Sequence, residues 1–319
     1  MPTTSHHRPS LAAILLVPVV AAIVLTLFAW PNARLEPRDL PVGVAGEPAA
    51  ATAIEQRLSA RDGAFAVHRY TDGAPARHAI EERDIYGAFV VTSAGPKLLT
   101  ASAASAAVSQ TLSHAAADSS ATPVPVHDVV AAAPAGAAFA SLLLPLIIAA
   151  SLTGVAATRL ASGALRRTGL IVTGSVLVGL TATAIVQSWL GVVEGEWAAN
   201  AAAMSLMVAA MASLVAGLEA LLGRAGTILG LLTMILVGNP LSGAASSPEL
   251  LPQPTGAIGQ LLPPGAGASL LRSTGFFDGA AAGGHVTVLA AWALAGVATI
   301  FLVAARTRHR LPATAPLPA

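Results

Sequence analysis

The sequence predicts an α-helical polytopic membrane protein with six transmembrane helices and a small extracytoplasmic α/β domain between helices 1 and 2. Hydrophobic residues make up 55% and charged residues only 10% of the 319 positions, and the mean hydropathy is +0.71. Soluble domains carry about a quarter charged residues. Most of the acidic residues fall between residues 31 and 135. The chain therefore combines membrane helices with one polar domain.

The first helix follows a short polar segment. Residues 1–10 are polar and slightly basic, and we assign them to a cytoplasmic N-terminus. Residues 11–30 are continuously apolar and match the roughly 20 residues that span a bilayer, so they form transmembrane helix 1. A cleaved signal peptide is the alternative, but its apolar region would be shorter, and Phe28-Ala29-Trp30 is a poor cleavage site. We expect an uncleaved anchor.

Residues 31–135 are predicted to form the extracytoplasmic α/β domain. Runs with strand character alternate with segments of helical periodicity, and this alternation is typical of an α/β fold. Roughly a hundred residues are enough to bury a core of their own. In chain order we expect strand 40–45, helix 50–60, strand 65–70, helix 76–83, strand 85–92, strand 98–101, helix 103–117 and an extended segment 123–130.

Residues 136–306 are predicted to form the transmembrane domain with helices 2–6. Pro145 is expected to kink the first of these helices. The fourth is short for a span unless it continues past Gly238. Residues 307–319 then form a cytoplasmic tail. The expected spans are 138–157, 169–193, 199–222, 225–237 and 285–305.

The placement of arginine predicts the orientation. Cytoplasmic loops carry an excess of basic residues, and the short loop with Glu194 and Glu196 has none. Both termini are therefore predicted to be cytoplasmic, with residues 31–135 outside. The arginine- and alanine-rich composition with a single lysine is typical of a high-GC bacterium, so we expect the bacterial cytoplasmic (plasma) membrane. The basic residues on the predicted cytoplasmic side are Arg8, Arg159, Arg166, Arg167, Arg224, Arg306, Arg308 and Arg310.

Residues 238–279 join the last two spans but match neither an ordinary loop nor a helix. The stretch is apolar and poor in charge, and its six prolines prevent one continuous helix. Apolar pieces remain at 257–262 and 268–271, and each is too short to span a bilayer. We interpret residues 239–284 as a re-entrant or interfacial segment, which must be buried in protein or line a wet cavity. A mildly apolar external loop is the alternative.

Few polar side chains lie within the predicted spans. Glu219 is the one clear ionisable group and is a functional candidate, although it lies near the cytoplasmic end, where it could pair with Arg224. Self-powered transporters need titratable or coordinating groups near the midplane. Such groups are scarce in these spans, so we do not expect a self-powered transporter, and we expect any transported substrate to be apolar or amphipathic. Asn200 is a further polar side chain, toward the outer side. The translocation-path candidates are Glu219, Gln187, Asn239, Pro240, Pro263 and Pro264.

Small residues recur at helical spacing within two of the predicted spans. Such spacing allows the close approach of another helix. In an alanine-rich sequence the same pattern also arises by chance, so both interpretations stay open. The positions are Ser205, Ala209, Ser213 and Gly217 in one span, and the GxxxG pair Gly226 and Gly230 in the next.

Common catalytic and nucleotide-binding motifs are absent from the sequence. Without GxxxxGK[ST], the chain cannot hydrolyse ATP by a phosphate-binding loop of its own. GxSxG and HExxH are also absent, and the histidines of the outer domain lack metal-ligand spacing. The lack of cysteine excludes disulfides and thiolate sites, and the net charge of +1 argues against a nucleic-acid partner. We expect no enzyme activity, cofactor or metal in this chain.

Three local stretches and the order of segments carry a family resemblance. The stretches are LPVGVA at 40–45, AIEERDIYGAFVV at 79–91, and GNPLS at 238–242 with LLPPG at 261–265 and FDG at 277–279. Together with one helix, an outer domain and five further helices, they resemble ABC-2-type transporter permeases. The most similar branch is that of phage-infection-protein-like membrane proteins with a large extracytoplasmic domain.

This resemblance implies an exporter subunit in the lipid bilayer. It implies a homodimer or heterodimer of permeases, a separate ATP-binding subunit, and a lipid-like, peptide or drug-like substrate. The family has a cytoplasmic coupling segment between helices 2 and 3, which residues 159–167 match in position. The candidates for partner docking are Arg159, Arg166, Arg167 and Arg224.

Two further functions stay open beside the permease. A non-transporting receptor, scaffold or envelope-assembly protein would display the outer domain and need no ATPase. A membrane-embedded enzyme would need a catalytic constellation, and the sequence offers none. An ATPase encoded beside this chain would favour the permease.

Overall fold

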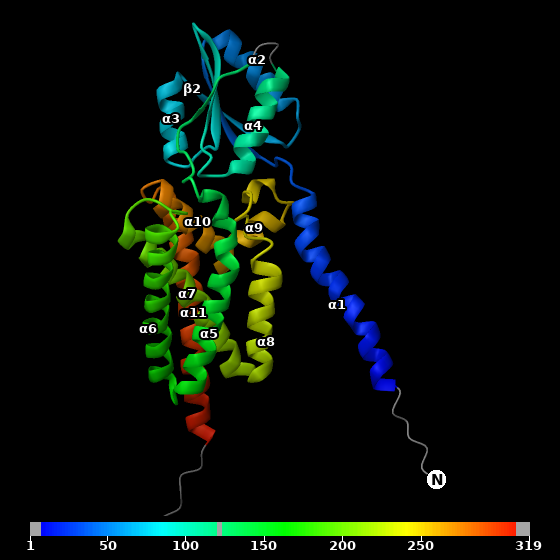
Figure 1. The fold of residues 1–319 in the computed structure, drawn as a ribbon, viewed down its shortest axis with the longest axis vertical. Coiled ribbons are helices and arrows are strands. Elements are labelled where there is room, and N and C mark those ends of the chain that lie inside the picture. The colour runs from blue at the N-terminus through cyan, green and yellow to red at the C-terminus, as the bar shows by residue number, and fades with distance from the viewer. Residues whose placement is uncertain (1–7, 120–122, 311–319) are drawn as a thin grey trace, which may run out of the picture.

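The computed structural model describes residues 8–119 and 123–310, so parts of the predicted N-terminal segment 1–10 and of the tail 307–319 lie outside the described residues. The protein is mostly helical, and a small sheet domain stands on one end of a helical bundle (Figure 1). Five helices in the described part are long and apolar enough to cross a membrane. They are Leu15–Ala33, Gly136–Leu160, Ala164–Trp189, Trp197–Leu222 and Ala282–Thr307.

The fourth of the five predicted spans of residues 136–306 is shorter than its neighbours. The apolar helix Arg224–Gly238 falls below the length of the other spans. At 1.5 Å per residue, its 15 residues extend about 22 Å, against a hydrocarbon core of about 30 Å. The helix lies within one residue of the predicted bounds 225–237 at each end, and it does not continue past Gly238 because the backbone turns there.

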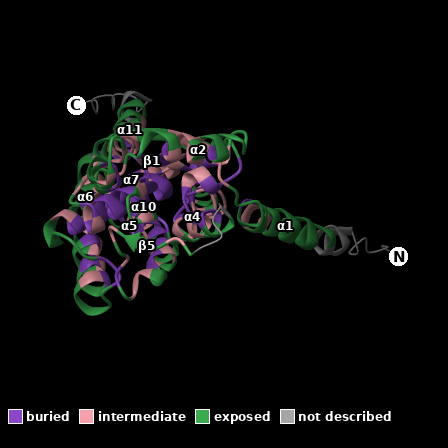
Figure 2. Ribbon diagram, turned by 90° about the horizontal axis from the view of Figure 1, so that it is seen from above, coloured by how far each residue is buried: buried purple, intermediate pink, exposed green. Residues whose placement is uncertain are grey.

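Helix α1, Arg8–Ala33, stands apart from the bundle for most of its length. Figure 2 shows it extending away from the rest of the molecule with an exposed surface. Leu16 and Val17, for example, are 60% and 68% exposed. Apolar side chains at this exposure are suited to lipid rather than to water.

The domain of residues 31–135, which we name the outer domain after its predicted location, has eight regular elements in its described residues, each within a few residues of its predicted position. Its five-stranded sheet has the order β2-β1-β3-β4-β5. All neighbouring strands are parallel except β3 and β4, which form an antiparallel hairpin. The elements are β1 Leu40–Gly46, α2 Pro48–Ser59, β2 Phe65–Tyr70, α3 Gly73–Glu81, β3 Gly87–Thr92, β4 Gly95–Thr100, α4 Ala106–Ser119 and β5 Val126–Asp128.

Both faces of the sheet are covered, and the bundle contributes to each core. Helices α2 and α4 cover one face, where Leu250 joins the buried cluster. Helix α3 covers the other face, where Phe277 joins the cluster. Leu250 and Phe277 are 2% and 5% exposed, and both belong to the segment that joins the last two long helices. The outer domain therefore completes its cores with side chains from the bundle.

The bundle is centred on the most buried of its long helices, α7. Helices α5, α6, α8, α10 and α11 pack around it. Its elements are η1 Gly136–Leu142, α5 Leu143–Leu160, α6 Ala164–Thr183, η2 Ala184–Trp189, α7 Trp197–Leu222, α8 Arg224–Leu232, η3 Thr233–Gly238, η4 Pro248–Leu250, α9 Thr255–Gln260, α10 Pro263–Phe276 and α11 Ala282–Arg310.

Pro145 does not interrupt a helix, contrary to expectation. It lies in the first turn of α5, directly after the 3₁₀ segment η1. The N–H groups of a first turn have no partner within the helix, so proline loses no hydrogen bond there. The predicted kink is therefore absent because the helix starts later than expected.

Small residues mark the closest helix contacts, as the spacing pattern predicts. A Cβ added to Gly296 of α11 would lie 2.4 Å from the carbonyl oxygen of Ser213 in α7. One added to Gly179 of α6 would lie 2.1 Å from Oγ of Ser205. The predicted seam on α7 thus faces two different helices. Gly226 places α8 against the backbone of α7 in the same way, at Leu218.

We expect Gly296→Ala to destabilise the bundle, because the added methyl group meets backbone atoms that cannot move independently. Overpacking of this kind costs about 1–3 kcal/mol. Gly283→Ala in the same helix is the control, since a Cβ there meets nothing within 4 Å. Thermal unfolding of both variants in detergent should give a lower midpoint for Gly296→Ala alone. Equal midpoints would contradict the close α7–α11 contact.

Candidate functional site

The segment between Gly238 and Ala282 folds back into the bundle. A Cβ on Gly238, where η3 ends, would lie 2.6 Å from Cγ of Pro264, so the short helix stops against the start of α10. Trp292 Nε1 of α11 donates to the carbonyl oxygen of Leu261, at 2.8 Å. Gly267 of α10 similarly packs on Met207 of α7. Residues 263–267 are therefore buried beside α7 and α11, while Leu261 lies at the same depth on the exposed surface of the bundle.

The depth of this turn follows from helix geometry. Trp292 and Met207 each lie ten residues from the end of their helix that faces the outer domain. At 1.5 Å per residue this is about 15 Å along the axis. Helix α9 therefore descends from the domain toward the middle of the bundle, and α10 returns to Phe276 at the top. We call α9 and α10 with their connection the hairpin.

Side chains satisfy the irregular backbone around the hairpin. Gln260 Nε2 donates to the carbonyl oxygen of Ser242, at 2.9 Å, and Gln260 Oε1 accepts from Ser269 Oγ, at 2.7 Å. Arg272 Nη2 donates to the carbonyl oxygen of Ala244, at 2.8 Å. Polar groups away from water are costly unless they are hydrogen-bonded. The side chains of α9 and α10 thus hold the preceding loop in place.

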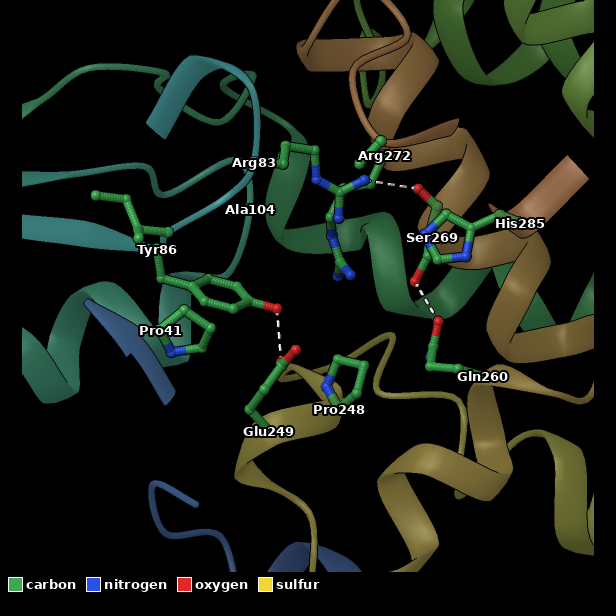
Figure 3. A pocket seen from close by; sticks show the side chains of 12 residues that line it. Pro41, Arg83, Tyr86, Ala104, Pro248, Glu249, Gln260, Ser269, Arg272 and His285 are labelled. Carbon is green, nitrogen blue, oxygen red and sulfur yellow. Dashed lines mark hydrogen bonds between the residues drawn. The ribbon is translucent and has the colours of Figure 1, made fainter. Parts of the chain in front are cut away.

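A polar cavity of about 190 Å³ lies between the outer domain and the hairpin (Figure 3). We call it the interdomain cavity. The domain contributes side chains from β1 and from the connection between α3 and β3, and the bundle contributes η4, α9, α10 and the start of α11. The lining residues are Pro41, Arg83, Ile85, Tyr86, Ala104, Pro248, Glu249, Gln260, Ser269, Arg272, Ala281 and His285.

Arg83 enters the cavity from the end of α3. It has φ of +64°, a left-handed conformation that glycine usually occupies after a helix. Its Nη1 donates to the carbonyl oxygen of Ser269, at 3.0 Å, and to Oγ of Ser273. Its guanidinium lies 5.3 Å from the ring centre of Phe277. Burial lowers the pKa of Arg83 from its ordinary value, but arginine stays charged in proteins.

Tyr86 and Glu249 form the second polar contact across the cavity. The Tyr86 hydroxyl donates to Glu249 Oε2, at 2.7 Å. Burial, followed by the negative charge of Glu249, raises the pKa of Tyr86 far above its ordinary value. Tyr86 therefore stays protonated and acts as a donor. Backbone bonds fix η4 in the same place, since Arg38 N donates to the carbonyl oxygen of Glu249, at 3.0 Å.

Arg272 is the most buried charged side chain of the site, at 6% exposure. Its guanidinium lies 4.7 Å from the ring centre of Phe139. It also lines a second cavity of about 310 Å³, between the outer domain and the start of α5. We call this the alanine cavity, because alanine supplies eight of its sixteen lining residues, and Phe139 and Phe276 are among the others. Arg272 is shared by a polar cavity and a largely apolar one.

The predicted translocation-path residues do not gather at one place. Pro263 and Pro264 begin α10, in the depth of the bundle. Asn239 and Pro240 line a separate small cavity near the domain-facing end of α1. Gln187 Nε2 donates to the carbonyl oxygen of Gly195, at 2.8 Å, so it holds the loop before α7. Asn200 Nδ2 donates to Gln187 Oε1 in the same network, at 3.0 Å.

Glu219 lies at the end of the bundle remote from the outer domain. Its Oε2 accepts from Thr158 Oγ1, at 2.8 Å, and from Thr227 Oγ1, at 2.9 Å. Its Oε1 lies 3.6 Å from Nη2 of Arg159. The expected pairing with Arg224 is wrong, because Glu219 faces α5 and Thr227, one turn beyond Arg224. Glu219 thus joins three helices and does not face the interdomain cavity.

The predicted coupling segment is a three-residue turn. Helix α5 ends at Leu160 and α6 begins at Ala164. Arg159 is engaged with Glu219, and Arg167 Nε donates to the carbonyl oxygen of Ala161, at 3.1 Å. Arg166 and Arg224 are exposed. Arg159 is exposed as well despite its contact with Glu219, so three of the four docking candidates are accessible to a partner.

Sequence reasoning missed the residues that line the interdomain cavity. Arg272 carried a signal, since it is a lone charge directly after an apolar piece. Glu249 carried a similar one, as the single acid among the prolines of residues 240–264. Arg83 and Tyr86 gave no comparable signal, because Arg83 lies in a charged run that is typical of a solvated surface.

Comparison with known proteins adds no assignment to this geometry. No protein-family profile, no curated protein and no solved structure matches the chain. Within residues 8–119 and 123–310, no group of three or more His, Asp or Glu side chains is arranged to hold a metal ion. The site is therefore interpreted from its own charges, cavities and contacts.

We expect Tyr86→Phe to destabilise the contact between domain and bundle, because Glu249 loses its donor. A hydrogen bond to a charged group contributes about 1.5–3 kcal/mol. Tyr70→Phe at the only other tyrosine is the control. The folded state raises the pKa of Tyr86, so the linked stability is complete below pH ~10 and falls as the pH rises further. At neutral pH the melting midpoint in detergent should be lower for Tyr86→Phe than for the wild type. As the pH rises above ~10, the midpoint of the wild type should fall more than that of Tyr86→Phe.

Proposed function

We propose that this chain is the permease subunit of an ABC-type exporter and moves an apolar or amphipathic compound with a separate ATP-binding subunit. In this proposal it crosses a bacterial cytoplasmic membrane six times, with both termini in the cytoplasm and residues 31–135 outside. A homodimer or heterodimer of permeases forms the functional unit. The helix Arg224–Gly238 and the hairpin together make the fifth crossing.

The hairpin is the observation that carries this proposal. A helix of 15 residues ends about 15 Å below the domain-facing end of the bundle, and two short helices fill the space above it. Broken helices at membrane depth are tolerated where they are buried in protein or line a wet cavity. In transporters such interrupted helices surround the substrate path. The interdomain cavity lies directly at the hairpin, which supports a path at this place.

The positions of the ionisable groups support an external source of energy. Within the long apolar helices, Glu219 is bound to Thr158, Thr227 and Arg159 at one end of the bundle. A proton relay needs titratable groups along the membrane. The sequence also lacks a phosphate-binding loop. A partner that hydrolyses ATP is the remaining source of power.

Two observations favour the alternative of a non-transporting receptor, scaffold or envelope-assembly protein. The connection between α5 and α6 has only three residues, which leaves a small surface for an ATPase. The cores that Leu250 and Phe277 complete also fix the outer domain on the bundle. A protein that only displays this domain would need nothing more. The two functions differ in whether an ATP-binding partner is bound.

Single cysteines test the proposed orientation, since the chain has none of its own. Ser93 in the β3–β4 hairpin and Ser162 in the α5–α6 turn are both exposed. We expect Ser93→Cys to react with an impermeant maleimide in intact cells, and Ser162→Cys to react only after permeabilisation. The reverse labelling pattern would mean that the orientation is inverted.

Arg166→Gln tests the partner. Arg166 is exposed, and arginine forks pair specifically with carboxylates. We expect the variant to lower the ATPase activity of a gently co-purified subunit about tenfold, which corresponds to a loss of roughly 1.4 kcal/mol in coupling. Arg77→Gln on exposed α3 is the matched control and should leave this activity unchanged.

Two results would count against the permease. Full stimulation with Arg166→Gln would remove the docking role of the α5–α6 turn. If no ATP-binding subunit accompanies the wild-type chain from native membranes, even after cross-linking from Arg166→Cys, the non-transporting function is the better one. A cross-link from Leu190→Cys, at the opposite end of the bundle, is the specificity control.

A further inference from the structure

The interdomain cavity holds more positive than negative charge. Arg83 and Arg272 supply two guanidinium groups, and Glu249 supplies one carboxylate. Among the described residues, no ion pair joins either arginine to a carboxylate. Charges that leave water are costly unless counter-charges meet them. One positive charge is therefore left without a counter-charge among the described residues that line the cavity.

Both guanidinium groups keep donors available. Arg83 uses Nη1 for its bonds to α10, and Arg272 uses Nη2 for its bond to Ala244. Each guanidinium has five N–H groups in a fixed fork. Figure 3 shows the two side chains converging on the middle of the cavity, above the Tyr86–Glu249 contact. Two forks that face one space are suited to an oxyanion with several acceptor oxygens.

The backbone at Arg83 also indicates that its side chain is needed. A left-handed conformation is unfavourable for arginine, and glycine would adopt it without strain. Such conformations cost of order 1–3 kcal/mol and cluster at functional sites. The position directs the guanidinium away from solvent and toward Ser269 and Ser273. The contacts that the guanidinium makes there offset the strain.

The alanine cavity adds a largely apolar surface to this charged site. It adjoins the polar cavity at Arg272, and half of its lining residues are alanine, with Phe139 and Phe276 adding aromatic surface. One cavity thus offers two guanidinium forks, and its neighbour offers an apolar surface. A molecule with an anionic head and an apolar body would contact both.

We propose that Arg83 and Arg272 bind the phosphate group of an amphipathic molecule, whose apolar part enters the alanine cavity. A phosphate has three terminal oxygens and can accept from two forks at once, whereas a carboxylate has only two oxygens. Glu249 opposes the anion and weakens its binding, so that release stays possible. That this molecule is transported cargo rests on the proposed function, but its binding does not.

Binding by the purified full chain in an uncharged, phosphate-free detergent tests this site. The probes are short-chain lysophosphatidic acid, the uncharged monoacylglycerol with the same chain, and inorganic phosphate. We expect lysophosphatidic acid to bind most tightly and to raise the melting midpoint. Inorganic phosphate should compete weakly, and the monoacylglycerol should bind at least tenfold more weakly than lysophosphatidic acid. Isothermal titration and thermal shifts measure both effects.

Three variants distinguish an anion site from a purely structural contact. Arg83→Asn keeps the left-handed backbone, which asparagine tolerates, and should weaken lysophosphatidic acid about 10- to 100-fold. Glu249→Gln removes the opposing charge and should tighten binding roughly tenfold. A misfolded variant does not gain affinity, so this gain is the more decisive result. Arg77→Gln on α3 is the control and should leave binding unchanged.

The outcomes separate the possible ligands. Equal binding of monoacylglycerol and lysophosphatidic acid, with unchanged affinity in Arg83→Asn and Glu249→Gln, would overturn the anion site. Equal binding of inorganic phosphate and lysophosphatidic acid would overturn the apolar part and leave a site for soluble phosphate groups. If the chain binds lysophosphatidic acid but no ATP-binding subunit co-purifies with it, the anion site is upheld and the permease is not. If an ATP-binding subunit co-purifies but lysophosphatidic acid does not bind, the permease is upheld and the anion site is not.

Discussion

The structure depends on satisfying an irregular backbone inside a helical bundle. Outside the short helices η4, α9 and α10, the segment from Gly238 to Ala282 is irregular, so the backbone N–H and C=O groups there need other partners. Gln260 and Trp292 bind carbonyl groups at 2.9 and 2.8 Å, and Arg272 binds another at 2.8 Å. The bonds of Gln260 and Arg272 join α9 and α10 to the loop that follows Gly238, and the bond of Trp292 joins α11 to the connection between α9 and α10. Because they require polar side chains in the interior, the same requirement places charge beside an internal cavity.

This segment also joins the two halves of the molecule. Leu250 and Phe277 enter opposite cores of the outer domain, while Ala266 and Leu270 belong to the core of the bundle. A displacement of α10 would therefore disturb both the domain and α7. The interdomain cavity lies at this junction, so a ligand bound there contacts both halves. Binding at the site, as we propose it, would thereby be coupled to the relative position of domain and bundle.

Much of the fold is accessible to sequence reasoning, because hydropathy and strand–helix alternation are local properties. The helix α7 and the strand β2 lie within two residues of their predicted bounds. The short helix also ends within one residue of its predicted bound at 237, but the contact of Gly238 with Pro264 was not predictable, because the two residues are 26 positions apart in the chain. The cavity was harder still, since Arg83, Glu249 and Arg272 meet only through tertiary packing. A charged run around Arg83 has the same composition whether it faces water or a cavity.

The two arginines differ in what holds them, and this difference bears on function. Arg272 is anchored within the bundle by Ala244 and Phe139, whereas Arg83 belongs to the outer domain and reaches across to Ser269 and Ser273. Repulsion between the two like charges opposes the approach of domain and bundle, and an anion between them reverses that effect. The apolar contacts of Leu250 and Phe277 also hold the domain against the bundle, as a bound anion would. Occupancy of the cavity would then strengthen a contact that hydrophobic burial already maintains.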